Sequence, residues 1–407
     1  MKKRVLIIGI TMAAAGSEKS FLSFAAHAID YEKYEVDLLL AKREGDFLDR
    51  IPKEIHVLDM GEMGELFLLD RKNAFSLIAK YGILRNPVRA ISFLPYILKR
   101  LLSSSSEKRT FVAQRIWLKL MENMPEFEEK YDIALAYWGD RTMFYMVDKV
   151  KADQKIAWLH FDYGKPPREN VLYEGYFSAC DRVITVSREI EESLKKALPC
   201  VASKILTVEN IIDEEEILLA SEGALDFEDE FSGIRILTMG RICDQKGYDL
   251  AVPAIARLKK EGHHIKWYIL GKGTVEEERS LTDLIRLHHV EDTVSILGVK
   301  KNPYPYIREA DIYMQPSRHE GKPISVEEAK ILCKPILVTN YTSASEQLEN
   351  GKFGEIADVS EEGIYQGLKK LLKDDALRLQ YSRVLSENKK EKNEVFLEKI
   401  LDKTDGK

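Results

Sequence analysis

The sequence predicts an α/β protein made of two doubly wound, Rossmann-like domains that face each other across a cleft. Its 407 residues are too many for one ordinary hydrophobic core. Short apolar runs of buried-strand type alternate with helical patterns along most of the chain. The alternation stops at an acid-rich stretch and then starts again, which indicates two separate sheets. Ligands of such sheets bind at the carboxyl ends of the strands, so the cleft is the expected site.

The first domain is predicted over residues 1–212, and it opens with a β-α-β pattern. Apolar runs at 4–10 and 35–40 flank a helical pattern at 18–29. The start of the chain also resembles a secretory signal. However, the helix that follows at once would have no sheet to pack on if the first apolar run were removed, so we expect this run to be a strand. Further elements are expected as strands at 55–58, 132–137, 155–159, 182–186 and 205–208, and as a helix at 187–198 that begins with Ser187.

A linker is predicted over residues 213–232, which are rich in acids and turn formers. The second domain is predicted over 233–375, and charged helices at 376–407 are expected to cross back and pack on the first domain. Strands are expected in this domain at 234–239, 266–270, 293–297, 311–315 and 335–339. Helices are expected at 248–260, 275–288, 325–332 and 360–372.

The charge of the chain is unevenly distributed. The net charge of −6 argues against nucleic acid as a partner. Residues 71–119, however, contain eleven Lys or Arg and one acid, Glu107, so this stretch carries +10 and the remainder −16. Two interpretations fit equally well: an amphipathic pair of helices in water, or a face that attaches to an anionic membrane surface.

The four cysteines suggest a reducing compartment. Cys180, Cys200, Cys243 and Cys333 are scattered and form no C-x-x-C pair, so neither a disulfide framework nor a metal site is expected. No apolar run reaches the 18 or so residues that a membrane-spanning helix needs. We therefore expect a cytoplasmic protein, with peripheral attachment to the cytoplasmic face of a membrane as the membrane interpretation of 71–119.

Two glycine-containing loops follow the first two strands of the second domain. The first, in 236-ILTMGRICDQKGYDLAV-252, carries Gly240, Arg241, Lys246 and Gly247. Two cations on one strand-to-helix loop are suited to neutralising a diphosphate, although a solvated loop with two surface charges is the simpler alternative. The second loop, in 268-YILGKGTVEEE-278, has a G-x-G that lets the backbone approach a ligand.

A third loop carries two glutamates eight positions apart. Glu320 follows the strand in 310-ADIYMQPS-317, and Glu328 is expected in the first turn of the next helix. Ser325 and Glu328 have the S-x-x-E spacing of a capping box. The free N–H groups at the start of this helix suit a phosphate or a sugar hydroxyl. Downstream, Ser345 and Glu346 are expected to open a short helix.

These motifs, in this order at successive strand ends, resemble the retaining GT-B glycosyltransferases of family 4, also called glycosyl transferases group 1, of the bacterial surface-polysaccharide type. The family pattern E-x7-E matches Glu320 and Glu328, and its N-terminal Gly-x-Glu-Arg/Lys element resembles 16-GSEK-19. The resemblance implies that Arg241 and Lys246 hold the donor diphosphate, that Glu320 faces the donor sugar, and that Glu328 accepts hydrogen bonds from the ribose. The donor-binding set that it implies is Gly16, Gly240, Gly271, Gly273, Gly321, Lys322, Ile324, Ser325 and Glu328.

In the first domain the resemblance points to a histidine near the reacting sugar. His160, in 157-AWLHFDYG-164, matches that position, although a single histidine after an apolar strand is more often a packing residue. Asp162, Lys165 and Arg168 nearby are candidates for binding the acceptor. The chain also departs from the family pattern, because Lys322-Pro323 stands where many members have Phe-Gly, and Ala15-Gly16 replaces a double glycine.

The expected activity is transfer of a hexose from a nucleotide sugar, expected to be a UDP-sugar, to a glycan or lipid-linked acceptor, with retention of configuration. No D-x-D pair stands at a strand end to hold a metal, so we expect a metal-independent enzyme without a cofactor. Two alternatives stay open: a GT-B sugar-nucleotide epimerase, and a non-catalytic sugar-nucleotide-binding partner of another transferase. The nucleotide base, the sugar and the acceptor are not specified by these motifs.

Overall fold

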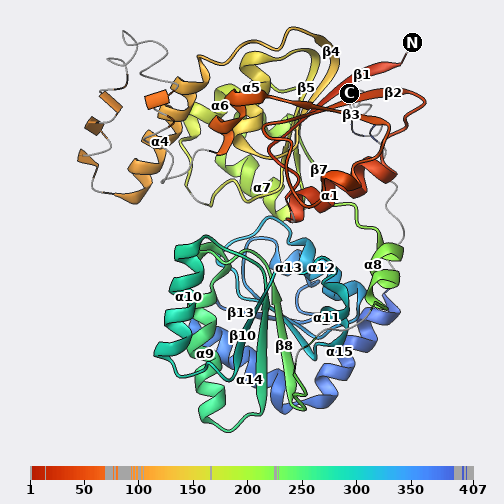
Figure 1. Ribbon diagram of the computed structural model, residues 1–407, viewed down its shortest axis with the longest axis vertical. Helices are drawn as coiled ribbons and strands as arrows, with labels where there is room; N and C mark the ends of the chain where they lie inside the picture. The colour runs from red at the N-terminus through yellow and green to blue at the C-terminus, as the bar shows by residue number, and fades with distance from the viewer. Residues whose placement is uncertain are drawn as a thin grey trace. The chain divides into compact units, whose positions relative to one another are not determined.

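The computed structural model divides the chain into two compact units (Figure 1). The N-terminal unit comprises Met1–Glu209 and Glu394–Lys407, and the C-terminal unit comprises Asn210–Asn393. The described residues are 2–388, without 14, 69–76, 78, 81–92, 94, 97, 100, 101, 104, 166, 224–226 and 228, together with 397 and 400. Much of the predicted basic stretch 71–119 and of the predicted tail 376–407 therefore lies outside the described residues.

The N-terminal unit is built on a parallel sheet of seven strands in the order β3-β2-β1-β4-β5-β6-β7. Its strands are β1 (Lys3–Gly9), β2 (Tyr34–Leu40), β3 (Ile55–Asp59), β4 (Lys130–Ala136), β5 (Lys151–Leu159), β6 (Arg182–Thr185) and β7 (Ile205–Thr207). β1 pairs with β2 on one side and with β4 on the other, and Val5 to Ile8 are fully buried. A parallel strand that is covered on both faces has a continuous apolar sequence, and for this reason these strands could be predicted.

Helices flank this sheet on both faces. They are α1 (Gly16–His27), α4 (Ser106–Met121), α5 (Asp140–Lys149), α6 (Asn170–Ser178) and α7 (Arg188–Ala197), with short 3-10 turns η1 (Leu48–Arg50), η2 (Gly61–Leu68) and η4 (Pro199–Lys204). The predicted cap of α7 is confirmed, since the Ser187 side chain accepts a hydrogen bond from the Ile190 amide at 3.2 Å.

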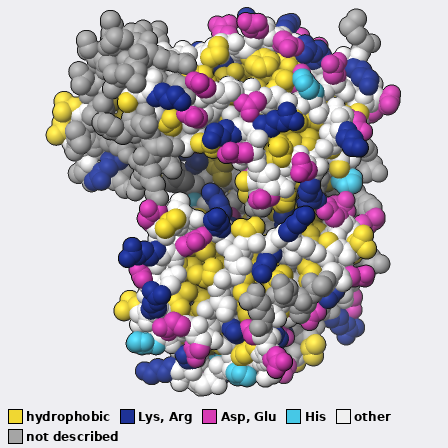
Figure 2. Space-filling model, in the orientation of Figure 1, with side chains coloured by type: hydrophobic (Ala, Val, Ile, Leu, Met, Phe, Trp, Pro, Cys, Tyr) yellow, Lys and Arg dark blue, Asp and Glu magenta, His cyan; other side chains and the backbone are white. Residues whose placement is uncertain are grey.

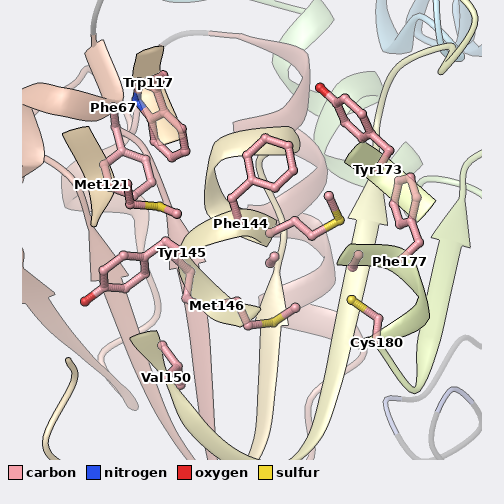
Figure 3. Packing of buried hydrophobic residues seen from close by; sticks show 14 of the residues in the cluster. Phe67, Trp117, Met121, Phe144, Tyr145, Met146, Val150, Tyr173, Phe177 and Cys180 are labelled. Atoms are coloured by element: carbon pink, nitrogen blue, oxygen red, sulfur yellow. The ribbon is translucent and has the colours of Figure 1, made fainter. Parts of the chain in front are cut away.

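The basic helix α4 is anchored to the core by its apolar face (Figure 3). Trp117 donates from its indole nitrogen to the Leu66 carbonyl at 2.7 Å, and its ring packs edge-on against Phe67. Met121 lies in the same cluster, as do Phe144 and Tyr145 of α5. Burial of an aromatic side chain of this size is worth about 2–3 kcal/mol. The cations of α4 are thus held on its outer side, while the attachment of this face to a membrane stays a prediction.

The C-terminal unit is built on a parallel sheet of six strands in the order β10-β9-β8-β11-β12-β13. Its strands are β8 (Ile234–Met239), β9 (Ile265–Leu270), β10 (Val294–Gly298), β11 (Ile312–Gln315), β12 (Ile336–Thr339) and β13 (Glu355–Ala357). Its helices are α8 (Glu214–Ser221), α9 (Tyr248–Lys260), α10 (Val275–Leu287), α11 (Tyr304–Glu309), α12 (Ile324–Ile331), α13 (Ala344–Gln347), α14 (Glu361–Lys373) and α15 (Asp375–Glu387), with the 3-10 turn η5 (Asp244–Lys246).

Helices cover both faces of this second sheet (Figure 1). One core lies under α9, α10 and α14, and a second lies under α8, α11 and α12. The predicted fold class, two doubly wound parallel sheets, is confirmed. None of the helices in the described ranges combines the length and apolar character that a membrane-spanning helix requires.

The predicted linker 213–232 contains a helix, which is a correction. Residues 214–221 form α8, whose N-terminus is capped by the Asp213 side chain accepting from the Glu216 amide at 2.9 Å. The three glutamates of its first turn suit the positive end of the helix dipole. In the tail, the Leu397 amide donates to the Ala28 carbonyl at 2.9 Å, within the N-terminal unit.

Asp229, in the predicted linker, fixes this stretch to the second sheet. Its carboxylate accepts hydrogen bonds from Lys266 at 2.5 Å, from the Tyr268 hydroxyl at 2.9 Å and from Arg235 at 3.3 Å. Burial by itself raises the pKa of the Asp229 carboxyl, but the bonds from Lys266 and Tyr268 outweigh it and hold the pKa below its ordinary value.

We predict that Asp229→Asn destabilises the C-terminal unit by about 1–2 kcal/mol at pH 7. A carboxyl with a depressed pKa in the folded state stabilises the fold above its ordinary pKa and loses that contribution as the pH falls through the folded pKa. The difference between variant and wild type should therefore shrink below about pH 4. Urea unfolding at pH 7 and pH 3 measures it, with the exposed neighbour Glu230→Gln as control. An equal effect of both substitutions, or a difference at pH 3 as large as that at pH 7, contradicts this account.

Candidate functional site

The loop after β8 is shaped by glycines that leave room for their neighbours. A Cβ on Gly240 would lie 3.0 Å from Cε of Lys246, whose side chain crosses this backbone. Gly247 has a φ of +66° and a Cβ there would lie 2.0 Å from the carbonyl oxygen of Pro316. The loop is therefore pressed against the end of β11, and only glycine fits at its last position.

This approach brings Lys246 to Glu320. The ammonium of Lys246 lies 2.7 Å from Oε1 of Glu320, and both side chains are nearly buried. The same carboxylate accepts from the hydroxyl of Ser317 at 2.5 Å and from the amide of Gln315 at 3.2 Å. Gln245 adds a longer contact to Oε2 at 3.4 Å. A buried carboxylate is tolerable only with such a cation and donors around it.

The G-x-G loop is packed directly on the loop that carries Lys246. A Cβ on Gly271 would lie 1.8 Å from the carbonyl oxygen of Gly240, and one on Gly273 would lie 2.5 Å from that of Ile242. Arg241 lies on the loop that also carries Lys246. Its side chain is exposed and has no ion-pair partner among the residues that the structure describes. The β8–α9 loop thus presents a guanidinium and an ammonium at the carboxyl end of β8.

The predicted capping box at Ser325 is wrong. α12 begins at Ile324, its N-cap is Pro323, and no side chain caps it. Ser325 donates instead to Oε1 of Gln315 at 3.3 Å. Pro323 lies at the N-cap with φ −63° and ψ 119°, so the helix begins one residue before the serine. Glu328 is consequently the fifth residue of α12, beyond the predicted first turn; it is 1% exposed and accepts from the Tyr304 hydroxyl at 3.2 Å.

Hydrogen bonds from the short helix α13 and its N-cap residue hold the loop between Glu320 and α12. Ser343 donates to the Gly321 carbonyl, and Gln347 donates to the Pro323 carbonyl at 3.0 Å. Lys322 is buried, and its ammonium lies 3.6 Å from Glu346 of α13. The cation that replaces the usual family residue is therefore directed to a carboxylate within the fold.

In the N-terminal unit, His160 follows β5 and lies on an aromatic surface. Its ring is parallel to that of Trp158 at 5.8 Å and tilted over Tyr137 at 4.5 Å. The Tyr137 hydroxyl shares a hydrogen bond of 2.8 Å with Ser20 of α1, the helix that begins at the exposed Gly16. Burial raises the pKa of Tyr137, so its hydroxyl stays protonated and fixed. The structure thus connects His160 to the helix that follows Gly16.

The three candidate acceptor residues lie on the loop after His160, in different surroundings. Asp162 is buried and accepts from the Gly164 amide at 2.9 Å. Arg168 pairs with Asp140 at 3.2 Å and donates to the Tyr163 carbonyl at 2.7 Å. Lys165 is exposed. Two of the three side chains therefore shape the loop, and the binding of an acceptor by any of them stays a prediction.

Several residues of the site were not selected from the sequence. Gln315 and Ser317 bind the Glu320 carboxylate, Tyr304 binds Glu328, and Gln347 holds the loop. Gln315 and Ser317 had a detectable signal, because they are polar residues at the end of an otherwise apolar strand. Tyr304 and Gln347 had none, since their roles depend on contacts with residues about two dozen positions away in the chain.

The site as a whole is suited to a ligand that carries both phosphates and hydroxyl groups. Cations and backbone N–H groups at strand ends bind phosphate, and buried carboxylates accept hydrogen bonds from hydroxyl groups. No cluster of acids, histidines or cysteines suited to a metal ion occurs among the described residues.

Comparison with known proteins assigns part of the chain to a family. Residues 226–392 match the family model of glycosyl transferases group 1. One relative is the N-acetylgalactosamine-N,N'-diacetylbacillosaminyl-diphospho-undecaprenol 4-alpha-N-acetylgalactosaminyltransferase of Campylobacter jejuni, 30% identical over 50% of this chain and 54% of that protein. Another is the amylovoran biosynthesis glycosyltransferase AmsK of Erwinia amylovora, 28% identical over 49% of this chain and 48% of that protein. The chain thus spans about half the length of these curated relatives.

A solved structure covers nearly the whole chain. The crystal structure of Anabaena Alr3699/HepE in complex with UDP and glucose superposes with a TM-score of 0.64, at 12% identity, over 95% of this chain and 94% of that one. At this identity the likeness establishes the fold alone. The resemblance inferred from the motifs is confirmed for residues 226–392, which match glycosyl transferases group 1, and the fold of the chain is the predicted GT-B fold.

Proposed function

We propose that the chain is a retaining glycosyltransferase that moves a hexose from a nucleotide sugar, expected to be a UDP-sugar, to a glycan or lipid-linked acceptor in bacterial surface-polysaccharide biosynthesis. The observation that carries this proposal is the buried Lys246–Glu320 pair at 2.7 Å, set against two glycine loops at the strand ends. The E-x7-E pattern alone gives only sequence spacing. This pair supports the proposal because a cation suited to a diphosphate lies beside the carboxylate that we propose to face the sugar.

The chemistry requires charge compensation at the leaving group. The bond between the anomeric carbon and the phosphate oxygen breaks, and its electron pair departs on the nucleoside diphosphate. The acceptor oxygen forms the new bond to the anomeric carbon, and its proton passes to the departing diphosphate. An ammonium has three N–H donors, so Lys246 has donors left for phosphate after its bond to Glu320. Each well-placed donor of this kind is worth about 3–4 kcal/mol in the transition state. We propose that Arg241 and Lys246 supply this charge without a metal.

The acceptor is proposed from a relative and from the position of His160. The name of the Campylobacter relative specifies a diphospho-undecaprenol-linked acceptor, which supports a lipid-linked glycan here. In the N-terminal unit, the fixed ring of His160 and the exposed start of α1 are the groups proposed to face the reacting sugar and the acceptor.

Two alternatives predict different products. An epimerase of the same fold would convert the nucleotide sugar without an acceptor, and a non-catalytic partner would bind the donor unchanged. Chromatography of the nucleotide sugar after incubation, with and without a lipid-linked glycan fraction, separates the three. Acceptor-dependent release of nucleoside diphosphate supports transfer.

The first test concerns donor binding. A panel of UDP-, GDP-, ADP- and dTDP-sugars should raise the melting temperature with one nucleotide series, and Lys246→Ala should abolish that shift because it removes the diphosphate cation. Lys260→Ala, an exposed lysine at the far end of α9, is the matched control and should keep the shift. The proposed donor site would be contradicted if no nucleotide sugar shifted the melting temperature, or if the shift remained in Lys246→Ala.

The second test separates binding from chemistry. Glu320→Gln keeps the shape of the side chain but removes the charge that faces the sugar. We expect nucleotide release to fall by about 10²–10³-fold, a loss typical of one electrostatic group in an active site, while the thermal shift with donor persists. The control is Glu349→Gln, whose carboxylate pairs at the surface with Lys352. Turnover of Glu320→Gln within threefold of wild type speaks against a role at the sugar.

We also propose peripheral attachment to an anionic membrane through residues 71–119. Each basic residue near such a surface contributes about 1 kcal/mol. Replacement of Lys99 and Arg100 by alanine should therefore weaken co-sedimentation with anionic liposomes by at least about tenfold. Neutral liposomes are the control. Undiminished binding of the double variant counts against electrostatic attachment.

A further inference from the structure

The two segments that carry the ion pair of the donor site are joined by further contacts. The lysine segment is 244–249, which comprises η5 and the start of α9, and the glutamate segment is 316–320, which follows β11. The Arg318 amide donates to the Gln245 carbonyl at 2.8 Å, and the Gln245 side chain donates to the His319 carbonyl at 2.9 Å. The segments are therefore connected along their length, and not only at the ion pair.

The guanidinium of Arg318 forms the strongest of these connections. It donates from Nη1 to the Asp244 carbonyl at 2.7 Å. It also binds the Asp249 carboxylate through two parallel bonds, from Nη1 at 2.7 Å and from Nη2 at 2.6 Å. A bidentate pair of this kind fixes the planar guanidinium in one orientation, which a single ammonium cannot achieve. One side chain of the glutamate segment thus holds the lysine segment at both of its ends.

The pair of Arg318 with Asp249 differs from an ordinary surface ion pair. Cations and acids are interspersed on the face that Figure 2 shows, and exposed pairs usually contribute little to stability. The Arg318 side chain is only 27% exposed, and its bidentate geometry is of the kind that does hold structure in place. The bonds from Arg318 also hold the pKa of the Asp249 carboxyl below its ordinary value, so the pair stays charged at neutral pH.

The position of Arg318 in the chain connects it to both members of the donor-site pair. Lys246 stands between Asp244 and Asp249, the two residues that the guanidinium binds. Glu320 follows Arg318 by two residues. A displacement of either segment would change the separation of 2.7 Å between the Lys246 ammonium and the Glu320 carboxylate. The geometry of the donor-site pair therefore depends on a guanidinium that lies outside it.

The same pair indicates which phosphate Lys246 would bind. Glu320 is proposed to face the sugar, and the sugar of a nucleotide sugar is attached to the distal phosphate of the diphosphate. A cation that is bonded to Glu320 is therefore nearest to the distal phosphate. A nucleoside monophosphate lacks this group, so its binding should be insensitive to the exact position of Lys246.

We propose that Arg318 and Asp249 are positioning residues that hold Lys246 against the distal phosphate of the donor. Neither side chain touches the ligand. Their bonds fix the backbone of both segments before the donor arrives, so less of the loop has to be ordered on binding. The inference rests on the proposed function, because it takes Lys246 as a cation of the diphosphate site.

The test is calorimetric titration of the full chain with UDP and UMP, or with the corresponding pair of nucleotides if the donor panel selects another base. Asp249→Asn keeps the shape of the side chain but removes its charge, and Arg318→Lys keeps the charge but loses the bidentate geometry. In both variants the affinity for UDP should fall by at least about fivefold, while the affinity for UMP stays within about twofold of wild type.

Glu362→Gln is the matched control variant. It breaks an ion pair of 2.6 Å with Arg257 on α9, the helix that follows Lys246, and should leave both affinities unchanged. The melting temperature of each variant without ligand measures stability separately. A lower melting temperature with an unchanged ratio of UDP to UMP affinity, or an equal loss of both affinities, overturns the proposal.

Failure of the proposed function gives a different result. If no nucleotide binds the wild type, or if Lys246→Ala binds UDP as tightly as the wild type, the donor site is contradicted and the positioning role with it. If Lys246→Ala loses UDP binding while Asp249→Asn and Arg318→Lys keep it, the positioning role alone is contradicted.

Discussion

The buried charge of Glu320 is the constraint on which the site in the C-terminal unit depends. A carboxylate that is 7% exposed is costly unless a cation and hydrogen-bond donors surround it. The cation comes from the β8–α9 loop and the donors come from the end of β11, so these segments must be in contact. That contact leaves no room for a side chain at Gly247, whose Cβ would meet the Pro316 carbonyl, so the same requirement explains this glycine.

The strands and the long helices were predictable because burial on both faces produces continuous apolar runs and clear periodicity. β8 and α9 have the predicted bounds, 234–239 and 248–260. Short elements were missed for a physical reason. α11 has six residues, too few for apolar positions to repeat with a helical period. α6 contains a glycine, which in sequence indicates a turn. The start of α12 was misplaced because Pro323 competes with Ser325 as a helix start, and local geometry decides between them.

The candidate site was predictable where its residues carry motif spacing, and not where it depends on long-range pairing. Lys246 and Glu320 were selected from the sequence, and the structure places them together. The burial of Glu328 against Tyr304 was not foreseen, because only folding brings α11 to α12. Likewise, nothing in the sequence indicated that Lys322 would be directed to Glu346 or Arg168 to Asp140. Spacing along the chain identifies which groups are available, and packing decides which of them face a ligand.

The candidate site in the C-terminal unit combines a fixed cation with an exposed one. Glu320 holds Lys246, while Arg241 is exposed. A paired cation loses little further side-chain freedom when a phosphate binds, but its charge is already partly neutralised. An exposed cation supplies net charge and attracts the anion over a distance, at the cost of its own ordering. A site for a diphosphate, with its several negative charges, benefits from both, since one kind of cation fixes the position and the other provides the attraction.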